Sequence, residues 1–541
     1  MLEPIKCTIP QIVQKCANIN EIATVFDSEN EKLTFSKIFN EMNVLAAGLL
    51  ASGLQMNDKV LICGSNCAQL FLSALACARA RLIFSLLNPN FSDAKQLQHA
   101  LNMGEFRAII CFSANKENEL LYNYLCETAP EIRSSAKGHV SSKAIPKLTH
   151  IIMAEEEHKH AGTFTLSEIY GRSNREKMEK MHPISDDNPD QLAVVQFTTG
   201  VTGQPKFVGL THYQLLNGCL SSVKALNIKK DDIVCCALPM FKIPIFTLVG
   251  LLPFVLGTQV IFPSPSPLPR FLFNSINSYK CTHLLTNAIA LRIILKILSA
   301  KNVELLSLNS IILAGERVPS EVINNITSQL KNVTNIVSTY LLTEVASMPI
   351  MTNNRADIIN CIGKAISGFQ INIAKDAVPV SSYKNSIGEL QIRPVFNSRF
   401  FGYGPKFSDG NVEWINTGDV VKLNESGNIC LIGNKDDLIF SSNGTLVEYW
   451  IIERTLCLCD LIKGAQVIKC SKNSPLTAIV VPKANSVDKF QIKSQLQSLC
   501  KNNKLEVPEK FGFVNELPRI STKIQKYRLR EMIQTGNLEL I

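Results

Sequence analysis

The chain has 541 residues, of which 46% are hydrophobic and 19% are charged, and its formal net charge is +9. This composition excludes a disordered chain, and the length predicts about three or four domain-sized units. The positive charge is spread along the chain and concentrates only in residues 172–180 (RSNREKMEK). A run of this kind in a polar connector is typical of a solvated helix, so we expect no nucleic-acid partner.

Residues 33–112 alternate between helical and extended patterns of apolar residues. The expected order is helix 35–54, strand 59–63, helix 68–81, strand 82–87, helix 93–101 and strand 108–112. Strands that alternate with helices are typical of a parallel α/β sheet.

Residues 114–189 are less regular and contain the charged run 155–160 (EEEHKH). Histidines beside glutamates are candidate metal ligands. However, no apolar framework surrounds this run in the sequence, so we expect a solvated charged loop.

Residues 194–212 (VVQFTTGVTGQPKFVGLTH) begin as a buried strand and continue into a loop rich in glycine and threonine. Glycines let backbone amides approach an anion, threonine hydroxyls add donors, and Lys206 adds a cation. The loop therefore predicts a polyphosphate site, and an ordinary hairpin loop is the alternative. Its spacing is not that of a Walker P-loop.

A second α/β stretch follows, with strands expected at 232–238, 281–286, 309–314 and 335–339. Within it, residues 243–262 carry no charge and are long enough to span a bilayer. Pro244 and Pro253 interrupt this run, and a turn is expected at 257–259. We therefore expect a buried helix followed by a buried strand, and no membrane span.

Beyond residue 385 the pattern changes to shorter strands separated by turns, at 388–393, 420–423 and 428–432. The polar segment 433–437 (GNKDD) is suited to a hinge. Strands at 466–469 and 476–481, a polar helix at 487–501 and a basic C-terminal segment complete the chain. We expect a large N-terminal domain, residues 1–432, and a small C-terminal domain, residues 438–541.

The chain contains 17 cysteines, an odd number, and we see no secretory signal before them. A long chain with these properties is typical of an intracellular protein, so we expect all of them to be reduced thiols.

The loop in residues 198–206 resembles the phosphate loop of the adenylate-forming enzymes, which include acyl-CoA synthetases, 4-coumarate–CoA ligases and beetle luciferases. Further stretches resemble the same family in the same order: 85–89 (SLLNP), 340–344 (YLLTE), 388–393 (GELQIR), 401–403 (FGY), 414–419 (WINTGD), 434–444 (NKDDLIFSSNG) and 518–524 (PRISTKI). The resemblance spans nearly the whole chain. It implies an α/β fold with a large N-terminal domain of stacked α/β sheets plus a β-rich subdomain, and a small mobile α+β C-terminal domain.

The resemblance also implies roles for individual residues. ATP would be bound by Thr198, Thr199, Gly200, Thr202, Gly203, Lys206, Gly315, Tyr340, Thr343, Asp419, Asn434 and Lys523. Tyr340 would stack on adenine, Thr343 would contact the α-phosphate, and Asp419 would accept both ribose hydroxyls. Mg²⁺ would be held by Glu344 and Thr202. The implied catalytic residues are Lys523, Thr343, Glu344 and Lys206, the acyl pocket contains Lys242 and Leu341, and Asp436 is the hinge residue.

Several positions depart from the family pattern. Asn434 stands where the family has an arginine, Lys242 where it commonly has a histidine, and Val201 where a hydroxyl is usual. Leu341, Thr522 and Phe207 stand where the family has glycine. Such substitutions are also expected of a protein that keeps the fold but has lost activity.

The resemblance implies an ATP-dependent acid–CoA ligase for a fatty or aryl carboxylate, which uses ATP, Mg²⁺ and coenzyme A. The alternatives are a catalytically weakened pseudoenzyme and luciferase-like oxidation of an adenylate. We expect a monomer or weak homo-oligomer. The chain ends in 537–541 (NLELI) rather than in a Ser-Lys-Leu address, so we expect a cytoplasmic protein, with the peroxisome as the alternative.

Overall fold

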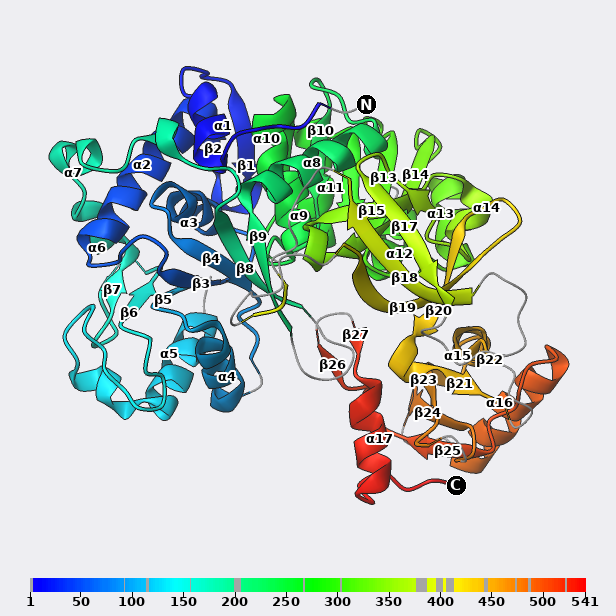
Figure 1. Cartoon of the computed structure of the whole chain (residues 1–541). Coiled ribbons are helices and arrows are strands. Elements are labelled where there is room, and N and C mark those ends of the chain that lie inside the picture. Colours follow the sequence, from blue (N-terminus) through cyan, green and yellow to red (C-terminus); the bar gives the residue numbers. More distant parts are fainter. Residues whose placement is uncertain are drawn as a thin grey trace. The chain divides into compact units, whose positions relative to one another are not determined.

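The chain forms two compact units, which Figure 1 shows in the colours of the sequence. The computed structural model describes residues 3–91, 93–112, 116–155, 157–198, 206–265, 268–301, 304–375, 387–395, 402–404, 413–441, 446–471, 474–484, 488–520 and 523–541. The first unit comprises Met1–Thr198, Phe207–Gln370 and Arg393–Ile415, and the second comprises Thr199–Lys206, Ile371–Ile392 and Asn416–Ile541. The predicted hinge at 433–437 lies inside the second unit, and a domain boundary there stays a prediction.

Two large sheets organise the first unit. The first has nine strands in the order β16 (Lys364–Ala365), β15 (Ser347–Thr352), β14 (Asn335–Leu342), β13 (Ser310–Ala314), β12 (His283–Thr286), β10 (Ile233–Cys236), β11 (Gln259–Phe262), β1 (Ile22–Phe26) and β2 (Glu31–Thr34). The second has seven, in the order β7 (Phe164–Thr165), β6 (His150–Met153), β5 (Ala108–Cys111), β3 (Lys59–Cys63), β4 (Ile83–Leu87), β8 (Leu192–Thr198) and β9 (Lys206–Thr211).

The α-helices of the first unit connect these strands. They are α1 (Ile9–Lys15), α2 (Phe35–Ala51), α3 (Ala68–Arg79), α4 (Ala94–Gly104), α5 (Lys116–Thr128), α6 (Leu166–Gly171), α7 (Arg175–Glu179), α8 (His212–Leu226), α9 (Ile243–Ile245), α10 (Leu251–Leu256), α11 (Pro269–Ser278), α12 (Ala288–Lys301), α13 (Ser320–Gln329) and α14 (Arg355–Ile358). Shorter helical turns are η1 (Asp27–Glu29), η2 (Pro130–Ser134), η3 (Ile184–Asp186), η4 (Phe246–Gly250) and η5 (Thr343–Val345). Several ends carry the expected caps: the Thr34 hydroxyl accepts from Lys37 N, and the Asp93 side chain accepts from Gln96 N.

The two sheets have separate apolar cores. One core packs against β10, β12, β13 and β14 and includes Leu284, Ile311 and Ile336, and the other packs against β3, β5 and β6. Strands β10, β12, β13 and β14 are mutually parallel. Their carboxyl ends therefore lie at one edge of the sheet, which is where open α/β sheets bind ligands.

The uncharged run at 243–262 forms a helical segment followed by a strand, as predicted. Helix α9 continues into the π-helical turn η4 and then α10, and Gly257 ends the segment with φ +82° before β11. Pro253 lies inside α10 and has no N–H for the carbonyl of Val249, four residues earlier, which belongs to η4. No helix in the described ranges is long and apolar enough to cross a membrane.

The charged run at 155–160 is less solvated than predicted. The His160 side chain is 8% exposed, its Nδ1 lies 2.9 Å from Glu155 Oε2, and its Nε2 lies 3.2 Å from Glu119 Oε2. The Tyr122 ring lies beside the imidazole, at 4.4 Å between centroids. The prediction of a solvated loop is wrong for His160, because two of its partners, Glu119 and Tyr122, come from α5 and are remote in sequence. Among the residues described, no group of three or more His, Cys, Asp or Glu could hold a metal ion.

The second unit is built on smaller sheets. Four strands are ordered β17 (Phe369–Ala374), β18 (Ile387–Pro394), β19 (Ile415–Leu423) and β20 (Ile429–Asn434), and one or two residues of β17, β18 and β19 belong to the first unit. After η7 (Lys435–Asp437) come β21 (Ile439–Phe440), β22 (Leu446–Val447), α15 (Tyr449–Leu456), β23 (Ile462–Ile468), β24 (Thr477–Pro482), α16 (Lys489–Asn502), β25 (Lys510–Phe513), β26 (Arg519–Ile520), β27 (Lys523–Ile524) and α17 (Lys526–Gln534).

Each unit contains one of the two tryptophans of the chain. The Arg393 guanidinium lies over the Trp414 ring at 4.8 Å in the first unit, and that of Arg454 lies over the Trp450 ring at 5.5 Å in the second.

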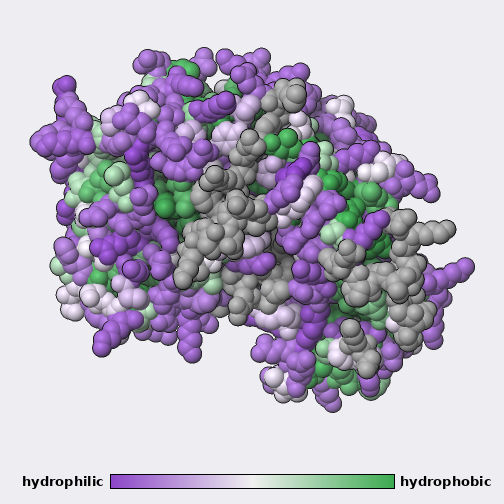
Figure 2. Space-filling model, in the orientation of Figure 1, coloured by the Kyte–Doolittle hydropathy of each residue, from purple (hydrophilic) through white to green (hydrophobic). Residues whose placement is uncertain are grey.

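Hydrophilic side chains predominate on the face of the molecule seen in Figure 2. Fifteen cysteines are free thiols, and most of them are buried. Cys361 and Cys430 are disulfide-bonded, so the prediction of reduced thiols is wrong for these two. Disulfide formation depends on the distance between residues in the fold, which neither the count nor the spacing of cysteines reveals.

Candidate functional site

Gly315 and the YLLTE motif of the first unit lie at one edge of the nine-stranded sheet, where β13 and β14 end. Ala314, the last residue of β13, pairs with Thr339 of β14, so Gly315 directly follows the sheet edge. Gly315 has φ +88°, and a Cβ built on it would lie 3.4 Å from Leu341 Cδ1. The predicted nucleotide residue Gly315 and the predicted pocket residue Leu341 are therefore neighbours, and the leucine fills space beside the glycine backbone.

The edge between β14 and β15 is irregular where the YLLTE motif lies. Tyr340 pairs with Ile350 but Leu342 pairs with Ser347, so the register shifts between them, opposite a segment containing Pro349. A bulge of this kind re-aims side chains and is frequent beside active sites. Tyr340, Leu341 and Thr343 are half-buried, whereas Glu344 is buried in η5.

Glu344, the predicted Mg²⁺ ligand, receives a hydrogen bond from a residue that carried no predicted site role. The Tyr403 hydroxyl donates to Glu344 Oε1 at 3.2 Å. Tyr403 forms a bridge with Val208 of β9, and Gly404 N donates to Phe207 O at 2.6 Å. The strand that follows the predicted phosphate loop thus helps to orient the Glu344 carboxylate.

The phosphate loop itself lies mostly outside the described residues. Strand β8 ends at Thr198, which is half-buried, and β9 begins at Lys206, which is exposed. The predicted roles of Thr199, Gly200, Thr202 and Gly203 fall in the segment between them, which the structure does not describe.

Two buried polar residues hold the segment that carries Lys242. On β8, Gln196 Nε2 donates to Leu86 O at 2.7 Å and to Phe241 O at 3.3 Å. Asn66 Nδ2 donates to Leu238 O at 2.9 Å, and Asn66 Oδ1 accepts from Met240 N at 2.7 Å. Lys242 is half-buried at the start of α9. The sequence offered one signal for Gln196, namely a polar residue inside an apolar run.

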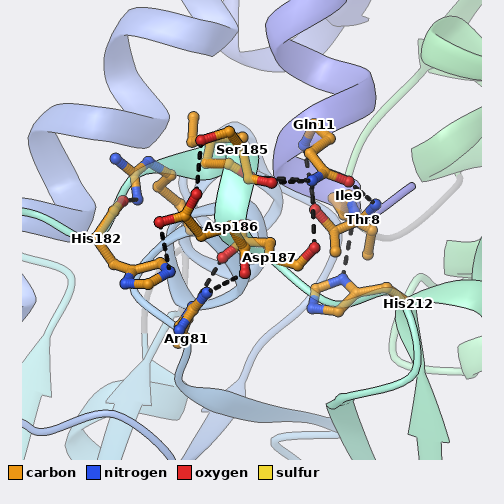
Figure 3. Close-up of polar contacts among 11 residues, drawn as sticks. Thr8, Ile9, Gln11, Arg81, His182, Ser185, Asp186, Asp187 and His212 are labelled. Atoms are coloured by element: carbon orange, nitrogen blue, oxygen red, sulfur yellow. Dashed lines mark hydrogen bonds and ion pairs between the residues drawn. The ribbon is translucent and has the colours of Figure 1, made fainter.

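A neutral histidine anchors the strand after the phosphate loop (Figure 3). His212, the first residue of α8, accepts a hydrogen bond on Nδ1 from Ile9 N at 3.3 Å. Burial, together with the nearby Arg81 guanidinium, lowers the pKa of His212 to about 3. Gln11 Nε2 donates to Ile184 O at 3.0 Å and fixes the same N-terminal segment. The N-terminal segment is therefore held here by the neutral side chains of His212 and Gln11, beside the ion pair of Arg81 with Asp187.

In the second unit, the structure brings two predicted nucleotide residues together. Asp419 of β19 and Asn434 of β20 are direct cross-strand partners. Gly418 precedes Asp419 with φ +75°, and a Cβ there would lie 3.2 Å from Asn434 Nδ2. Asn434 Oδ1 accepts from Asp436 N at 3.1 Å, so this side chain caps η7. Asp436, the predicted hinge residue, is exposed.

A buried carboxylate supports this turn. Glu389 is 3% exposed, and its Oε1 accepts from Gly418 N at 3.0 Å and lies 3.4 Å from Lys435 Nζ. Thr417 Oγ1 donates to Leu390 O at 2.8 Å. Glu389 therefore connects the residue before Asp419 to the residue before Asp436, which its place in the GELQIR motif alone did not predict.

Lys523 lies in β27, which pairs with β26 so that Lys523 faces Ile520. The side chain of Lys523 and residue Thr522 lie outside the described part of the structure.

Comparison with known proteins decides the family. Residues 13–399, more than half of the chain, match the sequence profile of the AMP-binding enzymes. The chain belongs to the AMP-binding enzyme family.

Two curated relatives of this AMP-binding enzyme are acyl-CoA ligases. It is 24% identical over 95% of its length to a mitochondrial medium-chain acyl-CoA ligase, ACSF2, from Bos taurus, and covers 85% of that protein. It is 25% identical over 78% of its length to the acyl-CoA ligase SID4 from Ajellomyces capsulatus, and covers 71% of it.

Among solved structures, an anthranilate CoA ligase, AuaEII, in complex with anthranoyl-AMP is similar to this AMP-binding enzyme at a TM-score of 0.79. The alignment covers 99% of both chains at 19% identity. This likeness confirms the predicted fold class of a large sheet-rich α/β N-terminal region with a smaller C-terminal domain.

The residues of this AMP-binding enzyme suit a nucleotide with a divalent cation. Mg²⁺ takes oxygen ligands and is commonly bound through one or two carboxylates together with substrate phosphates and water. The buried Glu344 carboxylate at the sheet edge matches this donor set, and its orientation is fixed by Tyr403.

Proposed function

We propose that the protein is an ATP-dependent acid–CoA ligase that activates a fatty or aryl carboxylate as an acyl-adenylate and then transfers the acyl group to coenzyme A. The observation that carries this proposal is the alignment with an acyl-CoA ligase over 95% of the chain. The sheet-edge placement of the YLLTE motif and the pairing of Asp419 with Asn434 support it.

In the first step the carboxylate attacks the α-phosphorus of ATP and pyrophosphate leaves. Both reactants are anions, so cations must lower their repulsion in a site shielded from water. Lys206 and Lys523 supply positive charge, Thr343 contacts the α-phosphate, and Asp419 accepts the ribose hydroxyls. Mg²⁺, held by Glu344 and Thr202, would neutralise charge on the phosphate oxygens.

In the second step the thiol of coenzyme A attacks the acyl carbon of the adenylate, and AMP leaves. A rotation of the small domain about Asp436 would remove Lys523 from the reacting atoms between the two steps. Asp436 is exposed, and its side chain does not have to leave a packed core for such a rotation.

ATP–pyrophosphate exchange with a panel of short, medium-chain, long-chain and aromatic acids tests this proposal. We expect acid-dependent exchange that requires Mg²⁺, and acyl-CoA on addition of coenzyme A. The medium-chain acids are tested first because the relative from Bos taurus is named as a medium-chain acyl-CoA ligase. Light emission in place of acyl-CoA would indicate luciferase-like chemistry. Absence of exchange with every acid would contradict the ligase.

A pseudoenzyme is the second candidate, and the departures from the family pattern favour it. The Leu341 side chain occupies space beside Gly315, and Asn434 is used as a cap rather than offering the charged fork of an arginine. ATP binding without acid-dependent exchange would support this candidate.

The location and the oligomeric state of the protein are further parts of the proposal. We propose a cytoplasmic monomer or weak homo-oligomer, with the peroxisome as the alternative location. One curated relative is named as mitochondrial, so a fluorescent fusion should be compared with markers for all three compartments. Light scattering during size-exclusion chromatography measures the oligomeric state.

A further inference from the structure

Helix α17 follows directly after the hairpin that carries Lys523, and its first residue is a buried lysine. Lys526 is 8% exposed, and its Nζ lies 2.7 Å from Glu453 Oε1. The same Nζ donates to Val467 O at 3.1 Å and lies 3.7 Å from the centroid of the Tyr449 ring. All three partners belong to α15 and β23, which form the body of the small domain.

The partner carboxylate has a second hydrogen-bond donor. Glu453 Oε1 also accepts from Val467 N at 2.9 Å, so acid, lysine and strand form one closed network. A buried charge is tolerated only when it is paired and hydrogen-bonded, and removal of one partner leaves the other uncompensated. The start of α17 is thus fixed to α15 and β23 by a contact that permits little displacement.

One turn further along α17, a second cation fixes the helix to the end of η7. Arg530 Nη2 lies 2.5 Å from Asp437 Oδ1, and Arg530 Nε donates to Lys469 O at 3.1 Å. Asp437 is buried, whereas Lys435 and Asp436 before it are exposed. Between the two cations, Leu529 is fully buried in an apolar cluster with Ile468 and Ile479.

We propose that Lys526 and Arg530 are positioning residues, which make the Lys523 hairpin and Asp437 move as one rigid body. This inference rests on the proposed function and on the predicted roles of Asp436 and Lys523. Because Arg530 fixes Asp437 to α17, the pivot lies at 434–436, before Asp437. Any rotation at 434–436 therefore moves α17 and the Lys523 hairpin together, with no change in their relative position.

Rigid attachment matters for the reaction because it sets the position of the Lys523 cation. A displacement of about 1 Å in a catalytic group costs on the order of a hundredfold in rate. Lys523 is separated from Lys526 by only two residues, so the placement of its backbone depends on how firmly the start of α17 is held.

Four variants of the full chain test this proposal: Lys526→Met, Arg530→Met, Asp437→Asn and the conservative Lys526→Arg. The matched control is Arg528→Met, which removes a cation from the exposed side of the same helix, where Arg528 Nε donates to the neighbouring Tyr527 hydroxyl at 3.3 Å. Three quantities are measured: ATP–pyrophosphate exchange, conversion of a supplied acyl-adenylate to acyl-CoA, and amide hydrogen exchange in β27 and α17.

We expect Lys526→Met and Arg530→Met to lower kcat of the exchange reaction by roughly tenfold to a hundredfold, with little change in KM for ATP. Amide exchange in β27 and α17 should rise, while the supplied adenylate is converted at close to the parent rate. Asp437→Asn should give a smaller change in the same direction. Lys526→Arg should recover most of the rate, since a guanidinium can also pair with Glu453.

Amide exchange equal to that of Arg528→Met would overturn the proposal, as would an equal loss in both half-reactions. The hydrogen-exchange arm does not depend on activity. If the parent protein shows no exchange with any acid, the ligase function fails, but faster amide exchange in Lys526→Met than in Arg528→Met still supports the rigid attachment of the hairpin, and unchanged amide exchange still overturns it.

Discussion

The two units hold their candidate site residues by different physical means. In the first unit, Gly315 and the YLLTE motif lie at the ends of strands in a nine-stranded sheet, and nearby polar contacts involve neutral groups such as Gln196, Asn66 and His212. In the second unit, β19 and β20 also align Asp419 with Asn434, but ion pairs add to this support: Glu389 with Lys435, Lys526 with Glu453, and Arg530 with Asp437.

This difference predicts different sensitivities. A position held by a backbone ladder keeps its place when a side chain is changed, and the effect of a substitution then reports on packing or on the substrate. A position held by paired charges is displaced when one charge is removed, because the remaining charge is left buried. Substitutions at the neutral contacts of the first unit, such as that of His212, should therefore change stability, and substitutions in the ion pairs of Lys526 and Arg530 should change rate.

The largest effect is expected for Lys523→Ala in the second unit. The lysine would bridge two anions during adenylation but would be remote during thioester formation. ATP–pyrophosphate exchange should fall by about a hundredfold or more. Conversion of a supplied acyl-adenylate should stay near the parent rate.

The matched control for Lys523 is Lys510→Ala, an exposed lysine of the same unit. An equal loss in both half-reactions would remove the assignment of Lys523 to the first step. An unaffected exchange rate would mean that another cation performs this role.

A smaller effect is expected from His212, which tests the neutral character of the first unit. Its folded pKa is about 3, below its ordinary value, so the unfolded chain takes up a proton at a higher pH than the folded chain. The stability from the neutral ring is present above about pH 6.5 and is lost as pH falls toward 3. This amounts to about 2 kcal/mol between pH 7.5 and pH 5.

His212→Asn keeps an acceptor near Ile9 N but cannot take up a proton. Urea unfolding followed by circular dichroism should therefore show a shallower loss of stability between pH 7.5 and pH 5 in this variant than in the parent. The matched control is His99→Asn, a change at an exposed histidine. A parallel pH dependence in parent and His212→Asn would show that His212 is not buried as a neutral ring.

Leu341→Gly should change acid preference by about tenfold, because removal of a side chain beside Gly315 opens space at the sheet edge. Bulkier acids should gain relative to small ones in ATP–pyrophosphate exchange, and Leu341→Ala should lie between the two. If the ranking of acids is the same in all three proteins, Leu341 does not face the acid.

The smallest effect is expected for Asn434→Arg, in which two changes oppose each other. The arginine adds a charged donor near the ribose, so ATP should bind a few-fold more tightly. The lost cap on η7 should lower unfolding free energy by about 1 kcal/mol. Isothermal titration with ATP separates the two effects, and unchanged or weaker ATP binding would show that residue 434 does not face the nucleotide.

Much of the fold could be predicted from local patterns. The apolar run at 59–63 gave β3 with the same bounds, and the predicted helix at 68–81 is α3. The N-terminal strands β1 and β2 were not predicted, because β1 joins the sheet beside β11, which is more than 200 residues away along the chain.

The candidate site was predictable where motif residues are adjacent in sequence, as in YLLTE, and less so where partners are remote. The contacts of Tyr403 with Glu344, Gln196 with Phe241 and Glu389 with Lys435 join segments separated by dozens of residues. The sequence alone does not indicate which buried polar groups form hydrogen bonds or ion pairs with one another in the folded chain. The pairing of Asp419 with Asn434 was likewise visible only once β19 and β20 lay side by side.

The placement of one tryptophan in each unit has a practical consequence for spectroscopy. Trp414 and Trp450 each lie beneath an arginine guanidinium, so the emission of each indole depends on the local structure around it. In Trp414→Phe, tryptophan fluorescence arises from the second unit alone, and in Trp450→Phe from the first alone. A single denaturant titration of the two variants therefore reports whether the two units lose their structure together or in sequence, without any attached dye.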